Sequence, residues 1–126
     1  MQRLCAALLW FIGGLSIANS LWMLAAPRHW FYHIPADVPA IGPFNSHFIQ
    51  DIGCAYLAAG LALMWGAAQP ASRRLLVTIA AVFYGGHALV HVWGTAAGDL
   101  PASHWLIDFP SVYLPALILA CIAAIP

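Results

Sequence analysis

Long apolar stretches separated by short polar interruptions account for most of the chain. A helix needs about 20 mostly apolar residues to cross a bilayer. Stretches of about this length fall at 4–26, 44–68, 75–93 and 105–125. Pro27 ends the first because proline interrupts the helical hydrogen-bond ladder, and Gly94 follows the third. The pattern predicts an all-α fold, a polytopic four-helix membrane bundle that forms one integral membrane domain over residues 1–126.

Local signals refine these four predicted helices. Asn45 or Ser46 suits the N-cap of the second, since a short polar side chain can accept a free backbone N–H. Pro115 is expected to kink the fourth and to free a carbonyl that the bundle must satisfy. Helix association in lipid depends on small residues, so inward packing is expected from the following positions: Gly13, Gly14, Ser16, Gly53, Ala58, Gly60, Gly85 and Gly86.

Composition narrows the class of protein. Hydrophobic residues make up 63% of the chain and charged residues 6%, whereas an ordinary soluble domain carries roughly 25% charged residues. Neither a soluble globular surface nor a disordered chain can be built from this set. The formal net charge is zero and no basic run occurs, so nucleic-acid binding has no electrostatic basis. The expected surroundings are a lipid bilayer.

The arginines predict the orientation in that bilayer. Arg3 precedes the first predicted span, and Arg73 and Arg74 lie between the second and third, while Arg28 alone lies on the opposite side. Because cytoplasmic loops carry the excess of basic residues, both termini are expected in the cytoplasm. The loops at 27–43 and 95–104 then face the periplasm, in a multi-pass protein of the bacterial inner membrane.

Ionisable side chains within the predicted spans indicate where function should be sought, since such groups are costly in lipid. They form three pairs with a spacing of four residues, which places each pair on one helix face. Counting about 1.5 Å per residue from the outer helix ends places these residues about 5–10 Å deep, except for His104 at the helix entry, and all in the same outer third of the bundle. The pairs are His47 with Asp51, His87 with His91, and His104 with Asp108.

Imidazole and carboxylate groups together are ligands for zinc, copper or non-haem iron. The predicted ligands are His47, His87 and His91, with Asp51 and Asp108 as ligands or as partners that orient the histidines. The leading hypothesis is a metal-binding integral membrane protein with its site open to the periplasm. It would be redox-active or handle the metal, alone or as an accessory subunit, and whether it is an enzyme stays open.

Other interpretations use the same residues. A b-type haem could be held by His47 with His87 or His91, although haem does not require the neighbouring carboxylates. A structural hydrogen-bond network would suit an accessory subunit without a cofactor, in a larger membrane complex or a homo-oligomer. A proton relay would lack its inner half, because below the outer third only weakly polar groups such as Ser16 and Thr78 occur.

Three further histidines are left open as members of the site. His104 is the weakest candidate of the paired residues, because it could simply face the aqueous interface, and His29 and His33 are interpreted as interfacial residues of the outer loop. The cysteines match no metal or redox motif and are expected to be free thiols. They are Cys5, Cys54 and Cys121.

Two motifs carry a resemblance to a family. The segment Phe44–Gly53 reads FNSHFIQDIG and is followed by Ala55-Tyr56-Leu57, and His87–His91 reads HALVH. With these motifs the chain resembles a family of small uncharacterised bacterial inner-membrane proteins with four predicted spans. The resemblance implies the four-span architecture, and it does not indicate any particular activity. The Asp/His/His set is also similar to ligand sets of membrane copper sites, which is a chemical analogy only.

Overall fold

The computed structural model describes residues 2–125, and its regular elements there are all helical. This confirms the all-α fold class. The elements follow in this order: α1 (Gln2–Ala25), α2 (Pro27–His33), η1 (Val38–Ala40), α3 (Ser46–Ala68), α4 (Pro70–Ala97), α5 (His104–Ile107), η2 (Phe109–Tyr113) and α6 (Leu114–Ala123).

Three of these helices are long and apolar enough to cross a membrane: α1 with 24 residues, α3 with 23 and α4 with 28. The Asn45 side chain accepts the amide of Phe48 and so caps α3, as predicted. The predicted end of the third span at Gly94 is wrong, because α4 continues to Ala97. Gly98, at a φ of 86°, adopts the left-handed conformation that ends helices, and the amides of Asp99 and Leu100 then return to the Gly94 carbonyl.

The fourth apolar stretch is interrupted rather than continuous. The four residues of α5 are followed by Asp108, by the π-helical η2 and then by α6. The carbonyl of Asp108 accepts the amides of both Val112 (2.8 Å) and Tyr113 (3.2 Å). The fourth stretch is therefore distorted by a wide helical turn that ends two residues before Pro115. Such π-helical turns are frequent at functional sites.

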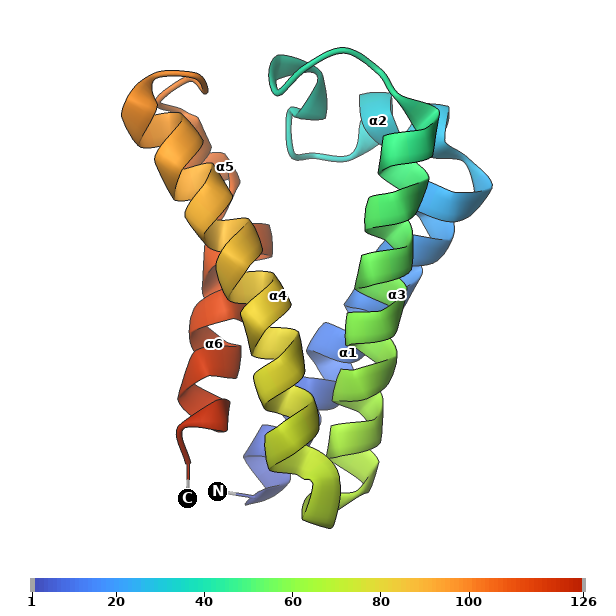
Figure 1. Cartoon of the computed structure of the whole chain (residues 1–126), viewed down its shortest axis with the longest axis vertical. Coiled ribbons are helices and arrows are strands. Elements are labelled where there is room, and N and C mark those ends of the chain that lie inside the picture. The colour runs from blue at the N-terminus through green and yellow to red at the C-terminus, as the bar shows by residue number, and fades with distance from the viewer. Residues whose placement is uncertain (1, 126) are drawn as a thin grey trace.

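The helices form two arms that share a core at one end (Figure 1). At the end that carries both termini, buried side chains of α1, α3, α4 and α6 pack together, including Leu9, Leu63, Val77 and Leu119. At the other end a separate cluster joins α1, α2, η1 and α3, and its buried members are Met23, Trp30, Phe31 and Ile49. The arm of α4, α5 and η2 is thus free at that end to position its own polar groups.

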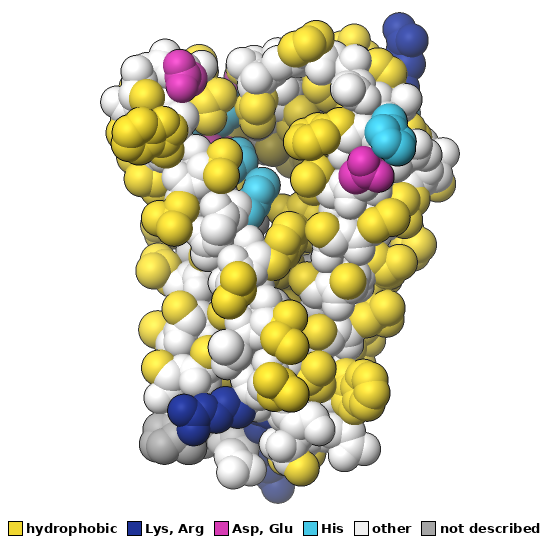
Figure 2. All heavy atoms as spheres, in the orientation of Figure 1, with side chains coloured by type: hydrophobic (Ala, Val, Ile, Leu, Met, Phe, Trp, Pro, Cys, Tyr) yellow, Lys and Arg dark blue, Asp and Glu magenta, His cyan; other side chains and the backbone are white. Residues whose placement is uncertain are grey.

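The surface has the character expected of a protein embedded in lipid. Large apolar side chains are exposed along all three long helices, for example Phe11, Leu61 and Val82. In Figure 2 hydrophobic side chains cover the length of the visible face, most basic groups lie at the end with the termini, and acidic and histidine side chains lie toward the opposite end. The exterior therefore separates basic from acidic groups along the long axis.

Arg73 stabilises the turn between α3 and α4, which yields a first prediction. Its Nε donates to the Gly66 carbonyl (2.9 Å) and its Nη2 to the Ala67 carbonyl (3.2 Å), satisfying the end of α3. We expect Arg73→Ala to lower the free energy of unfolding by about 1 kcal/mol. Detergent unfolding should show little change for Arg74→Ala, because that neighbour is exposed. Equal losses in the two variants would contradict the capping role.

Candidate metal centre

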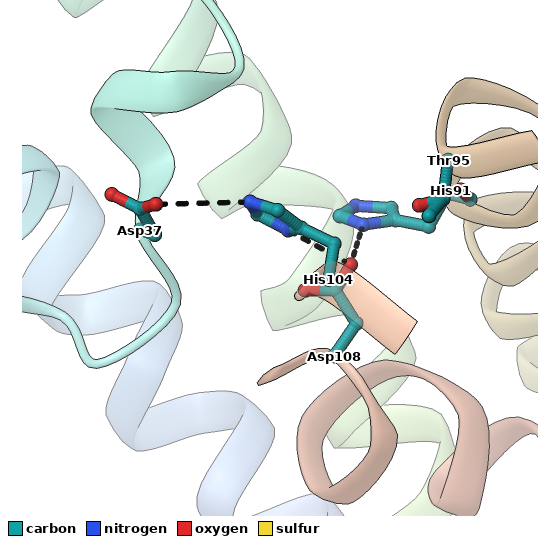
Figure 3. Close-up of polar contacts among 5 residues, drawn as sticks. All are labelled: Asp37, His91, Thr95, His104 and Asp108. Atoms are coloured by element: carbon teal, nitrogen blue, oxygen red, sulfur yellow. Dashed lines mark hydrogen bonds and ion pairs between the residues drawn. The ribbon is translucent and has the colours of Figure 1, made fainter. Parts of the chain in front are cut away.

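Three side chains converge beside the free ends of α4 and α5 (Figure 3). His91 comes from α4, His104 begins α5, and Asp108 follows α5 directly. The Asp108 Oδ2 lies 2.8 Å from the His91 Nδ1 and 3.2 Å from the His104 Nδ1. One possible ligand atom from each residue lies within 4.8 Å of the others, so this cluster could hold a metal ion.

The local sequence explains why these groups meet. Gly98 allows the sharp reversal after α4, so that the segment beginning with α5 returns alongside it. His104 and Asp108 are four residues apart on one helical turn, and the Asp108 amide donates to the His104 carbonyl (3.0 Å). Thr95 Oγ1 donates to the His91 carbonyl (2.9 Å), so the Thr95 hydroxyl is already hydrogen-bonded within α4. The three side chains therefore meet because of the turn at Gly98, the four-residue spacing of His104 and Asp108, and the wide turn of η2 that follows.

The cluster is almost completely buried. His104 is 0% exposed and Asp108 1%, and the side chain of His91 is 13% exposed. A buried carboxylate is costly unless cations or hydrogen-bond donors compensate it. Here Oδ2 has two donors, whereas the other Asp108 oxygen, Oδ1, and the His104 Nε2 have no hydrogen-bond partner among the described residues. The site therefore retains polar capacity that the chain itself does not use.

His47 and Asp51 are not brought to this cluster. They form a pair with each other on α3, with 3.5 Å between His47 Nε2 and Asp51 Oδ2, and their side chains are 88% and 62% exposed. The buried face of α3 is defined by residues such as Ile49 and Gly53. His47 and Asp51 each lie two positions from Ile49, which at about 100° per residue turns them to the opposite side of the helix.

His87 lies beside the cluster but outside the group of three. Its ring is 4.7 Å from that of His91, centre to centre. It also packs edge-on against Tyr56 (5.9 Å) and parallel to Phe83 (6.2 Å). These contacts place His87 in the aromatic packing between α3 and α4. Of the five predicted ligands, the structure thus groups His91 with Asp108 and sets the other three elsewhere.

His104, which the sequence leaves open because it could face the aqueous interface, belongs to the cluster. The sequence signal that pointed to it was its four-residue spacing to Asp108. His29 and His33 lie in α2, stacked on each other at 4.1 Å, and His29 Nδ1 accepts the Trp22 indole N–H. The cysteines are free, as expected.

The donor set of this site is two imidazoles and one carboxylate, which suits zinc, copper or iron. A scan against protein-family models finds no match for the chain, and searches of curated proteins and of solved structures find no similar protein. The helices and this His/Asp cluster therefore define the class: a helical protein with three helices long and apolar enough to span a membrane and a group that could bind a metal.

Proposed function

We propose that this protein binds one transition-metal ion between His91, His104 and Asp108. The observation that supports this most directly is the convergence of two Nδ1 atoms on a single carboxylate oxygen, at 2.8 and 3.2 Å. An ion that replaces the two N–H protons would receive two nitrogen ligands and one oxygen ligand, and its charge would offset the buried carboxylate.

Three protein ligands leave a coordination position for water or a substrate, which is the arrangement of catalytic rather than structural metal sites. The ion would accordingly take part in redox chemistry or in metal handling, with copper, zinc and iron all compatible with the ligands. Arg3, Arg73 and Arg74 favour a cytoplasmic location for the end that carries the termini. The metal would then lie toward the periplasmic side of a bacterial inner membrane.

One observation favours a second function. The Asp108 carboxylate already accepts N–H groups from both imidazoles, so the three side chains could fasten α4 to α5 without any ion. In that case the protein would be a structural subunit of a larger membrane complex. The two functions differ in the metal content that they predict for the purified protein.

Elemental analysis and an absorption spectrum of the detergent-purified protein test the proposal. We expect about one metal ion per chain in the wild type and none in a His91→Ala/His104→Ala double variant. His29→Ala/His33→Ala is the matched control, because it removes two histidines outside the cluster. A metal-free wild type, or equal loss in the control, would overturn the proposal, and a Soret band would identify haem instead.

The ligand roles predicted for His47, Asp51 and His87 remain predictions and can be tested in the same way. Because the exposed pair on α3 lies apart from the cluster, we expect a His47→Ala/Asp51→Asn variant to keep its metal. His87→Ala is expected to weaken binding only modestly, through loss of packing against the His91 ring. Loss of the ion in the first variant would show that the ligand set includes α3.

A further inference from the structure

A fourth polar residue approaches the cluster from the other arm of the molecule. Asp37 lies in the loop between α2 and α3, immediately before η1. Its Oδ2 is 3.9 Å from the Nε2 of His104, on the ring edge opposite Asp108 (Figure 3). That distance is too long for a hydrogen bond, and the Nε2 is buried without a partner. The carboxylate is half-exposed, so this loop contacts both solvent and the site.

The position of the N–H on the His104 ring defines a role for Asp37 as a hydrogen-bond acceptor. A neutral imidazole carries one N–H, and a metal at Nδ1 needs the lone pair of that atom. The remaining N–H must then be at Nε2, where Asp37 is the acceptor that faces it and Asp108 and the His91 ring occupy the other side. Histidines that bind metals commonly donate their second N–H to a carboxylate, which fixes the ring and makes it a better ligand.

We infer that Asp37 is a positioning residue for the metal centre: its carboxylate accepts the Nε2–H of His104 and holds the ring with Nδ1 toward the ion. This inference rests on the proposed function. The loop needs to approach by about 1 Å to reach an ordinary N–H···O distance. Asp37 itself adopts a left-handed backbone conformation (φ 47°, ψ 39°), which non-glycine residues adopt rarely and which recurs at functional sites.

A hydrogen bond from His104 to Asp37 would also join the two arms of the molecule. Asp37 belongs to the arm of α1, α2 and α3, whereas His104 belongs to the arm of α4 and α5. A hydrogen bond between them connects the arms at the end where they lack a shared core (Figure 1). Metal binding is therefore expected to order the loop of residues 34–43 against the cluster.

Titration of the metal-free full-length protein with Zn²⁺, and in parallel with Cu²⁺, tests the inference. Asp37→Ala should weaken binding about 10–100-fold while the stoichiometry stays the same, because the ligands themselves remain. Asp37→Glu should recover part of the affinity, since it restores a carboxylate. Asp99→Ala is the matched control, an exposed aspartate of the other outer loop, and should bind as the wild type does.

A second measurement separates positioning from a general structural effect. In the zinc-loaded protein with ¹⁵N-labelled histidine, the His104 Nε2–H should be protected from solvent exchange, and Asp37→Ala should remove that protection. The signal is assigned by its loss in His104→Gln. An Asp37→Ala variant with wild-type affinity and unchanged protection would overturn the inference alone. A wild type that binds neither ion would overturn the proposed function as well.

Discussion

Replacement of Asp108 by asparagine is expected to weaken metal binding by at least about 100-fold, or roughly 3 kcal/mol. The substitution keeps the shape of the side chain but removes the charge and one ligand of the proposed ion. In the absence of metal, the same substitution should change the free energy of unfolding little, or raise it. The asparagine side-chain oxygen can still accept both imidazole N–H groups, and loss of the buried charge offsets the weaker hydrogen bonds to a neutral acceptor.

Loss of metal affinity in Asp108→Asn, with the metal-free fold retained, supports the metal-binding function. A purely structural site predicts no metal in the wild type, and hence none to lose. Asp51→Asn is a matched control, because Asp51 also follows a histidine by four residues but is exposed on α3. Zinc titration and detergent unfolding of both variants make the comparison. Metal binding by Asp108→Asn at wild-type affinity would contradict a ligand role.

Much of the fold could be predicted from the lengths of the apolar stretches. Three of them became α1, α3 and α4 because lipid-compatible length and helical hydrogen bonding are both properties of local sequence. The ends were less predictable. Gly94 and Gly98 are both reasonable helix terminators, and only the conformation of Gly98 decides between them. That both termini lie at one end is visible in Figure 1, while their cytoplasmic location stays a prediction.

For the candidate site, the sequence did not predict which helix faces point toward one another. The four-residue spacings correctly paired the neighbouring groups, whereas their depth in the bilayer stays a prediction. Depth does not give the direction in which a helix face points. That direction depends on which residues of the helix pack against its neighbours. Ile49 and Gly53 turn α3 toward α1, so His47 and Asp51 face outward despite the matched depth predicted for them. His104 and Asp37 are near each other through the tertiary arrangement of α5 and the loop between α2 and α3.

The contact between α1 and α3 supports a second large prediction, now on stability. A Cβ at Gly13 would lie 2.9 Å from the Met64 Cγ and 3.0 Å from the Gly60 carbonyl oxygen, and the Gly60 position is equally close to the Gly13 carbonyl. Backbone atoms cannot move aside as a flexible side chain can. Gly13→Leu should therefore force the helices apart and lower the free energy of unfolding by about 3 kcal/mol, the upper end of the usual cost of overpacking.

Gly14→Leu is the matched control for Gly13→Leu, since Gly14 is exposed and a Cβ at this position has no atom within 4 Å. Its effect should stay within about 0.5 kcal/mol. Similar losses in both variants would show that the close approach of α1 and α3 does not hold the fold. All three proposed ligands lie between residues 91 and 108, outside this contact. Under conditions where Gly13→Leu remains folded, it should therefore still bind about one zinc ion per chain, which separates damage to the bundle from damage to the site.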